Sequence, residues 1–156
     1  MAAHDPSGPE LAEFLESVRM LMRDYAPNNL LLEDTQFKDE EIVRAIRMAV
    51  SEYNSMSPST RITWRALPED LLFLGVARWL TLSESFLQIR NQVAVPTDGL
   101  GVVGIDDKFQ LYQSLTEQLK QEFQQRCRML KNEMNLASGY GSLRSGYAGV
   151  SRFYNN

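Results

Sequence analysis

The feature that most constrains this chain is a long apolar run near its middle, residues 67–90. Pro68 suits the first position of a helix, where a missing N–H costs nothing, and Glu69 and Asp70 place negative charge at the positive end of the helix dipole. The apolar side chains that follow cover more than one face of a helix, and such a helix is normally buried. The run therefore predicts a central helix, covered by several other helices or by a neighbouring subunit.

A membrane-spanning helix is the main alternative at this length. Arg78 and Glu84 lie inside the run, together with Thr81, Ser83 and Ser85, and charged side chains are costly in the hydrocarbon of a bilayer. We therefore interpret the run as the core of a soluble domain and predict no contact with a membrane.

Length, charge and cysteine usage narrow the class of protein. At 156 residues the chain is expected to form one domain with a substantial core. Its net charge of −4 argues against a general nucleic-acid binder. Cys127 is the single cysteine, which excludes an internal disulfide and fits a reducing compartment. The polar, acidic start shows no secretory-signal pattern.

Two helices are predicted before the central one. The first follows a flexible lead-in at residues 1–8, begins near Pro9 with Ser7 and Glu10 at capping-box spacing, and stops by Ala26. Its apolar face consists of Leu11, Phe14, Leu15, Val18, Leu21 and Met22. A connector at residues 28–37 leads to the second helix, residues 39–54, whose apolar positions are Ile42, Ala45, Ile46, Ala49, Val50 and Tyr53. Polar and apolar residues alternate over residues 61–66. This pattern is typical of a short strand or of an extended link, and it does not distinguish between the two.

The segment after the central helix, residues 91–107, reads as a β-hairpin or a long extended loop. Turn residues surround Asp98-Gly99, and the flanking apolar positions are Val93, Val95, Val102, Val103 and Ile105. An isolated hairpin is only marginally stable in water, so we expect these positions to contact something outside the helical body.

Asp106 or Asp107 can then cap a last helix that runs to about Asn135. Its apolar residues recur in four-residue steps from Leu111 to Cys127.

The last 21 residues, 136–156, have a different composition. They carry Arg144 and Arg152 and no acid, which leaves 14 basic and 20 acidic residues, a net charge of −6, in the rest of the chain. Their glycines and serines prevent this segment from folding alone. Tyr140, Tyr147, Phe153 and Tyr154 nevertheless accompany the two arginines, and Tyr and Arg are typical anchors of interfaces. We therefore expect an extended arm that orders on a partner, although an unstructured tail with chance aromatics would look similar.

No catalytic, cofactor-binding or metal-binding residues are predicted. His4 is the only histidine and lies in the lead-in, which gives histidine-based catalysis no support. Cys127 falls on an apolar helical stripe, where a buried structural thiol is the expected interpretation. Asp39, Glu40 and Glu41 suit a helix start without any metal. Residues 99–104 superficially resemble a phosphate loop but lack its lysine.

Taken in order, several segments resemble the head-to-tail connector proteins of tailed bacteriophages, also called adaptor or head-completion proteins. The segments that carry the resemblance are residues 18–24, 37–42 with Ala45 and Ala49, 53–54 before Pro58, the apolar central helix, 87–92, 104–108 and 111–113. The similarity spans about residues 10–135. Lys38 stands where such proteins often have a serine cap, and residues 136–156 do not align with the family pattern.

The resemblance implies a non-enzymatic virion protein, made in the host cytoplasm and located at the head-tail junction. It implies an oligomeric ring, commonly of about twelve copies, that binds the portal protein, extends the channel for genomic DNA and supports the next neck or tail protein. Residues 136–156 would be the portal-docking arm, with Tyr140, Leu143, Arg144, Tyr147, Arg152, Phe153 and Tyr154 as its contacts. Residues Val93, Val95, Val102, Val103 and Ile105 would contact an adjacent subunit or the neck protein.

The fold class expected from all of this is mainly α. It is a small bundle of about four helices over residues 9–135, with a protruding hairpin or loop at 91–107 and an extended C-terminal arm at 136–156. The alternative function is a soluble helical protein–protein interaction module outside any virion, such as a regulator or an assembly chaperone.

Overall fold

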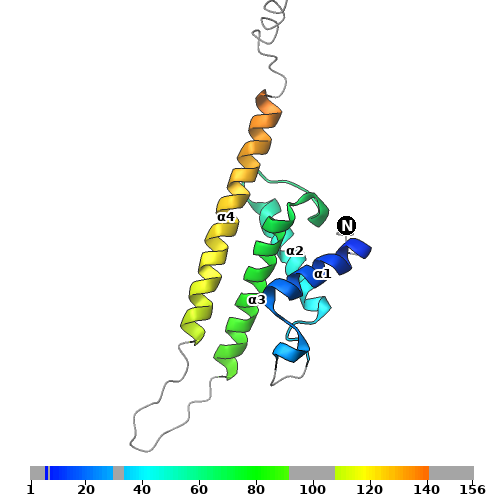
Figure 1. The fold of residues 1–156 in the computed structure, drawn as a ribbon. Coiled ribbons are helices and arrows are strands. Elements are labelled where there is room, and N and C mark those ends of the chain that lie inside the picture. The colour runs from blue at the N-terminus through cyan, green and yellow to red at the C-terminus, as the bar shows by residue number, and fades with distance from the viewer. Residues whose placement is uncertain (1–5, 7, 30–33, 92–107, 141–156) are drawn as a thin grey trace, which may run out of the picture.

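The computed structural model describes residues 6, 8–29, 34–91 and 108–140 and is helical throughout its regular elements (Figure 1). Four α-helices are present in these ranges: α1 (Pro9–Met22), α2 (Asp39–Ser55), α3 (Glu69–Asn91) and α4 (Lys108–Tyr140). Two short 3-10 helices, η1 (Ala26–Asn28) and η2 (Trp64–Ala66), lie in the connections. The predicted mainly α class with about four helices is confirmed for these residues. The predicted hairpin at 91–107 lies outside them, apart from its first residue.

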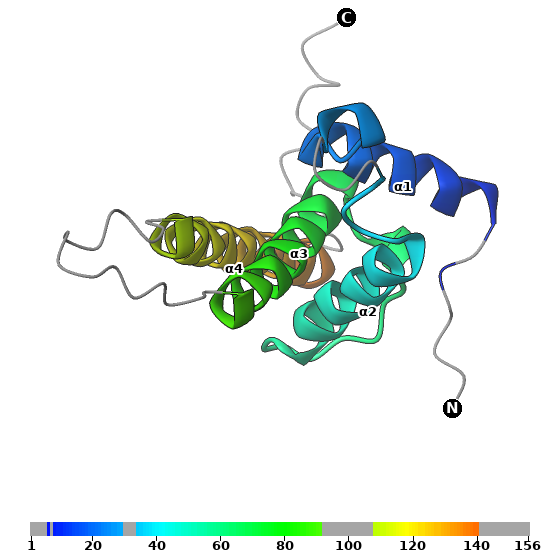
Figure 2. The same cartoon turned by 90° about the horizontal axis from the view of Figure 1, so that it is seen from below.

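Helix α3 is the centre of the body, as its sequence predicts. It packs between α2 and α4, and α1 crosses the same bundle beside α2 (Figure 2). Along α3, Leu71, Leu72, Val76, Ala77 and Leu80 are all buried. A helix that is apolar on several sides can be buried on several sides. Here α1, α2 and α4 all pack against α3.

Gly75 lies where the three main helices of the body come closest. A Cβ atom added to Gly75 would lie 2.6 Å from the Cβ of Ala49 on α2 and 2.9 Å from the ring of Phe123 on α4. Both neighbours are fully buried. The absence of a side chain at this position therefore allows α2 and α4 to approach α3 from two directions at the same level.

The start of α1 differs from the expected capping pattern. Gly8, rather than Ser7, occupies the N-cap position with φ of 98°, and no side chain caps the helix. The helix ends at Met22, followed by Arg23 in the left-handed conformation with φ of 58°. The predicted apolar face is confirmed for Phe14 and Val18, which are buried, whereas Leu21 is exposed.

The buried carboxylate of Asp24 joins α1 to the start of α2. It accepts hydrogen bonds from the backbone N–H groups of Gln36 (2.5 Å) and Phe37 (2.9 Å). It also accepts from the side chains of Asn29 (2.8 Å) and Arg19 (3.2 Å). A buried carboxylate is tolerated when its oxygens are satisfied in this way. Asp24 therefore determines how the chain enters α2.

Residues 56–68 connect α2 to α3 without forming a strand. The side chain of Asn54 organises this segment by bonding the backbone of Ile62, donating to its oxygen at 2.9 Å and accepting from its N–H at 3.0 Å. Trp64 then lies in η2 and packs on Phe14 of α1 with ring centroids 6.4 Å apart. Of the two forms left open for residues 61–66, the extended link, ending in a 3-10 turn, is the one observed.

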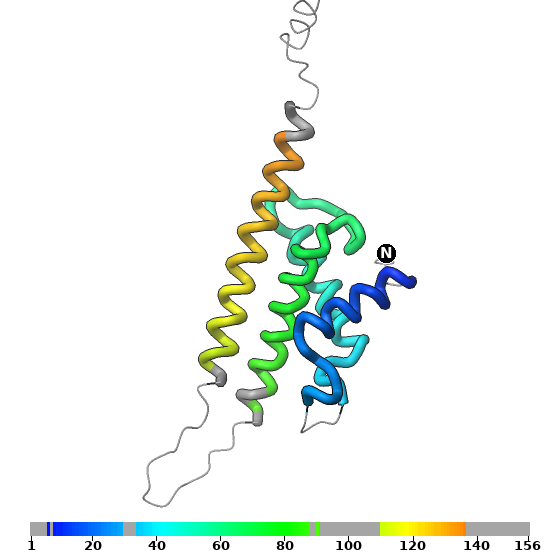
Figure 3. Tube along the Cα trace, viewed as in Figure 1, coloured from blue at the N-terminus to red at the C-terminus, as the bar shows by residue number. Residues whose placement is uncertain are grey.

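Helix α4 is longer than predicted and its apolar stripe is only partly buried. It has 33 residues, about 50 Å at 1.5 Å per residue, and continues to Tyr140 rather than to about Asn135. Phe123 and Cys127 are buried against α3, but Leu111 and Leu115 are exposed. In Figure 3, α4 runs alongside α3, and its C-terminal end projects beyond the other helices.

Candidate interaction surface

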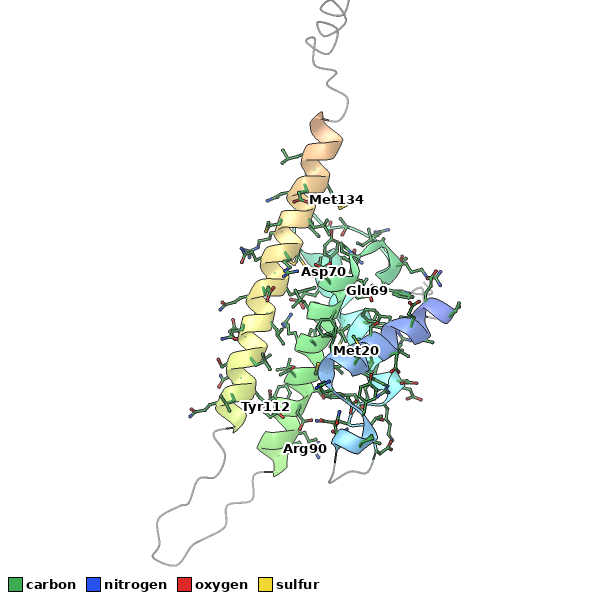
Figure 4. All side chains as sticks on the ribbon, viewed as in Figure 1. Met20, Glu69, Asp70, Arg90, Tyr112 and Met134 are labelled. Atoms are coloured by element: carbon green, nitrogen blue, oxygen red, sulfur yellow. The ribbon has the colours of Figure 1, made fainter. Side chains whose placement is uncertain are left out.

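A groove of about 1160 Å³ lies at the end of the body where α3 ends and α4 begins. It is bounded by the connector before α2, by the first half of α2, by the second half of α3 and by Tyr112 of α4. Figure 4 places Arg90 and Tyr112 at this end, and Asp70 and Met134 at the other. A concave surface of this size is a candidate binding site.

The wall of the groove is largely apolar. The side chains concerned are Phe37, Met48, Trp79, Leu80, Phe86 and Leu87. Phe86 is 59 % exposed and Met48 is 46 % exposed, while Leu80 is buried and continues into the core. Phe86 and Leu87 belong to the apolar run of the central helix, but both are exposed. Isolated exposed apolar residues are ordinary, whereas a concave cluster marks a binding surface.

Two arginines lie on the rim of this groove. Arg44 and Arg90 are both exposed and line the groove, and neither pairs with a described residue. The acidic groups of the groove are differently placed, because the Glu41 carboxylate accepts from the Lys38 N–H at 2.8 Å and Glu84 is buried. The rim therefore carries charges of both signs, because Glu41 is exposed like Arg44 and Arg90.

Tyr112 brings α4 into the groove. Burial raises the pKa of its hydroxyl above the usual value, and the nearby Glu84 carboxylate raises this pKa further. Tyr112 therefore stays protonated at neutral pH. Its ring closes the groove on the α4 side, beside the helix turn that carries Leu111 and Leu115.

The indole N–H of Trp79 has no hydrogen-bond acceptor in the part of the chain that the structure describes, although the nitrogen is buried. The guanidinium of Arg78 lies over the Trp79 ring, 5.0 Å from its centroid, and pairs with Glu52 of α2. A buried donor without an acceptor costs about 1–3 kcal/mol. The indole N–H of Trp79 is therefore an unsatisfied buried donor among the described residues.

Leu111 and Leu115 form a second apolar feature, which we name the α4 ridge. Leu111 is 68 % exposed and Leu115 is 45 % exposed. Four residues turn an α-helix by about 400°, so residues in steps of four drift by about 40° per step. The predicted stripe from Leu111 to Cys127 therefore winds around α4, and only its later members reach α3. The ridge is the part of this stripe that turns away from the body.

A second polar cluster lies near the other end of α4. Lys131 is 2 % exposed, and its ammonium donates to the carbonyl oxygens of Met56 (2.6 Å) and Pro58 (2.7 Å). It also lies 4.5 Å from the centroid of the Tyr53 ring. Burial lowers the pKa of Lys131. This contact attaches α4 to the segment after α2.

Cys127 lies next to this cluster and is buried, as predicted from its position on the stripe. Burial raises the pKa of its thiol to about 12, and the Glu52 carboxylate adds to the increase. Because the thiolate is the reactive form of cysteine, Cys127 is a poor nucleophile at neutral pH. Its role in the described structure is to fill the core between α4 and its neighbours.

The acidic residues at the start of α2 make contacts within the fold. Asp39 pairs with Arg19 at 2.5 Å, and Glu41 accepts from the backbone of Lys38. Within the described ranges, no group of three or more His, Cys, Asp or Glu side chains could hold a metal ion.

None of the helices described is long and apolar enough to cross a membrane.

The residues predicted to contact partners fall almost entirely beyond the described ranges. Tyr140 is the last residue of α4, at the end of that helix away from the groove. The other predicted portal contacts, Leu143, Arg144, Tyr147, Arg152, Phe153 and Tyr154, lie outside the described residues, as do Val93, Val95, Val102, Val103 and Ile105.

Sequence reasoning did not single out the groove. Its walls come from segments distant along the chain, and no local pattern marks Arg44, Met48 or Arg90. The one signal in the sequence is the surplus of apolar residues in α3, which predicts an external partner without locating it.

Comparison of the chain with protein-family models, curated proteins and solved structures finds no match.

Proposed function

We propose that this chain is a structural subunit of a phage head-to-tail connector. In this role it forms a ring between the portal and the neck or tail proteins, surrounds the path of the genomic DNA, and catalyses no reaction. The proposal starts from the resemblance of residues 10–135 to connector proteins. It also places the protein in the virion after synthesis in the host cytoplasm.

The observation that carries the proposal is the exposed apolar surface at one end of a body whose core is already filled. Phe86, Leu87 and Met48 surround the groove, and the α4 ridge lies at the same end. A subunit that contacts copies of itself on two sides needs two different surfaces of this kind.

The far end of α4 supports the assignment of the docking arm. This end projects beyond the other helices (Figure 1), and its exposed side chains include Met134 and Leu136. Residues 141–156 continue from here and contain Arg144 and Arg152 without any acid. We infer that this basic, aromatic segment reaches the portal, because α4 itself ends away from the other helices.

The charge of the chain suits the passage of DNA. The net charge is −4, and a wall that neutralises few phosphates binds the DNA backbone weakly. A ring of such subunits would therefore let the genome slide through without sequence-specific contacts.

Imaging tests this proposal directly. The full chain is mixed with the portal protein of the same phage, and the complexes are imaged by electron microscopy. We expect a closed ring on the portal, coaxial with its channel. Portal particles that carry no added ring would refute the connector role.

Copy number separates this function from the alternative, a soluble helical regulator or assembly chaperone. Quantitative mass spectrometry of purified virions should find the protein at a small constant ratio to the portal. A chaperone or regulator would instead be lost from mature particles.

The predicted interface at residues 93–105 has a separate test. Replacing Val95 or Val102 by Asp should reduce ring formation on the portal, because a charge would then have to be desolvated at the contact with a neighbour. The free energy of unfolding of the isolated subunit should stay unchanged, as measured in urea. A large loss of that free energy would instead place these side chains in the core.

A further inference from the structure

We propose that Met134 is a site of oxidation by peroxides, and that its sulfoxide binds the Tyr53 hydroxyl and fastens the C-terminal part of α4 to the body. The inference concerns the link between α2 and α4 and does not depend on the connector role. It starts from one contact between residues 81 positions apart in the chain, in which the Tyr53 hydroxyl donates to the Met134 sulfur at 3.8 Å.

This contact gives a buried hydroxyl a weak partner. Tyr53 is fully buried, and the Met134 sulfur is the only acceptor for its hydroxyl among the described residues. A thioether sulfur is a weak hydrogen-bond acceptor. Burial raises the pKa of the Tyr53 hydroxyl, so this group keeps its proton at neutral pH and remains a donor. A stronger acceptor at the same place would therefore stabilise the contact.

The sulfur of Met134 is also accessible from solvent. The side chain is 49 % exposed and lies near the C-terminal end of α4 (Figure 4). Met20, Met48 and Met129 are similarly exposed, but none of their sulfur atoms accepts a hydrogen bond from a described residue. Met134 therefore differs from these methionines in joining an exposed sulfur to a buried donor.

The oxidation transfers one oxygen atom from hydrogen peroxide to the sulfur. A lone pair of the sulfur attacks one peroxide oxygen, the O–O bond breaks, and the departing hydroxide takes the proton of the transferred oxygen to form water. The sulfur is oxidised by two electrons and the peroxide is reduced, so no other reactant is needed. Methionine sulfoxide reductases reverse the change, with one enzyme for each sulfoxide epimer.

The sulfoxide oxygen can reach the Tyr53 hydroxyl. The 3.8 Å between the hydroxyl oxygen and the sulfur exceeds the usual O–H···O distance of about 2.7 Å, which leaves space for an oxygen carried by the sulfur. Methionine has three rotatable bonds, so the exposed side chain can turn this oxygen towards Tyr53. Because half of the Met134 side chain is already in contact with water, the added oxygen costs little in desolvation.

The sign of the effect distinguishes Met134 from a methionine in a core. Oxidation of a core methionine places a polar oxygen among apolar side chains and disrupts their packing. At Met134 the oxygen instead provides a strong acceptor for a donor that has a weak one. Lys131 already joins α4 to the segment after α2 through the carbonyl oxygens of Met56 and Pro58. A stronger Tyr53 contact beside it should hold this part of α4 more tightly.

Hydrogen exchange of the full chain before and after treatment with hydrogen peroxide tests the proposal. Peptide mass spectrometry first establishes that Met134 carries one added oxygen. The amides of residues 131–138 should then exchange about threefold more slowly, which is in the lower part of the range expected for one hydrogen bond. Reduction by both methionine sulfoxide reductases should restore the original rates.

Matched variants separate Met134 from the other methionines. Met134→Gln places an amide oxygen near the position of the sulfoxide oxygen and should slow the exchange of residues 131–138 without peroxide, whereas Met129→Gln on the same helix should not. Both positions are exposed, so this comparison does not disturb the core. Tyr53→Phe keeps the ring and removes the donor, so peroxide should no longer slow the exchange in that variant.

Three results would overturn the proposal. The first is a chain in which Met129 carries the sulfoxide and Met134 does not. The second is unchanged or faster exchange of residues 131–138 once Met134 is oxidised. The third is equal slowing in Met129→Gln, or in oxidised Tyr53→Phe, which would assign the effect to a contact other than the one between Tyr53 and Met134.

Discussion

At the scale of single residues, Gly75 shows how closely the three main helices approach one another. An alanine there would place its Cβ 2.6 Å from Ala49 and 2.9 Å from Phe123. Alanine is the better helix former by about 1 kcal/mol, but overpacking a filled core costs about 1–3 kcal/mol. Because Ala49 and Phe123 are both fully buried, neither can move aside without disturbing the packing of its own helix.

We therefore expect Gly75→Ala to lower the free energy of unfolding by up to about 2 kcal/mol, the balance of these two terms. Urea denaturation followed by circular dichroism measures the change. Ser51→Ala, at an exposed position of α2, is the matched control and should stay within about 0.5 kcal/mol of the original protein. A stabilised Gly75→Ala variant would show that α2 and α4 approach α3 less closely than described.

Burial of Cys127 should make the free energy of unfolding fall as the pH becomes alkaline. Its thiol pKa is about 12 in the folded chain, against about 8.5 in an unfolded one. The folded state thus favours the protonated thiol. This contribution to stability is complete below about pH 8.5 and is lost as the pH rises towards 12, by at most about 1.4 kcal/mol per pH unit.

Cys127→Ala isolates this effect. The variant should be less stable at pH 7.5, since it leaves a small cavity, but its stability should fall less steeply between pH 8.5 and 10.5. The raised pKa values of Tyr53 and Tyr112 affect both proteins, so the difference between the two urea midpoints reports mainly on Cys127. Parallel pH profiles would contradict the assigned burial of the thiol.

At the scale of elements, the contact of Lys131 with the segment after α2 attaches the second half of α4 to the body. Its ammonium is the donor for the carbonyl oxygens of both Met56 and Pro58. Lys131→Met preserves the apolar stem but leaves those two acceptors unpaired, which costs about 1–3 kcal/mol. Hydrogen exchange should accelerate in residues 130–136 and in the amides adjoining residue 56.

Lys120→Met provides the comparison on the same helix. Lys120 pairs only with Glu117 among the described residues, at 3.0 Å on the surface, and such pairs contribute about 0.5 kcal/mol or less. Its replacement should leave the exchange of residues 130–136 unchanged. If the two variants behave alike, the carbonyl contacts of Lys131 do not hold the helix.

The elements differ in how far their sequence alone predicts them. Pro68, the acids behind it and the apolar residues on several sides are enough to identify α3 and its central position. The apolar stripe of α4 recurs every four residues and therefore winds around the helix, but the sequence does not show which end of the stripe faces α3. The groove was not predictable, since Arg44 and Arg90 are brought together only by the packing of α2 against α3.

At the scale of the whole molecule, the two ends of the body carry different surfaces. The groove and the α4 ridge lie at the end marked by Arg90 and Tyr112, and the projecting end of α4 lies at the other (Figure 4). In the proposed ring, the first end contacts neighbouring copies and the second directs residues 141–156 to the portal. Lateral assembly and portal attachment should therefore respond to different mutations.

Deleting residues 141–156 tests this division of roles. Helices α1 to α4 lie entirely before this point, so the shortened chain should keep its circular dichroism spectrum and its urea midpoint. Its attachment to the portal should be lost, because the deletion removes Arg144, Arg152 and the aromatic residues between and beyond them. Unchanged portal attachment would show that the arm is not the docking element.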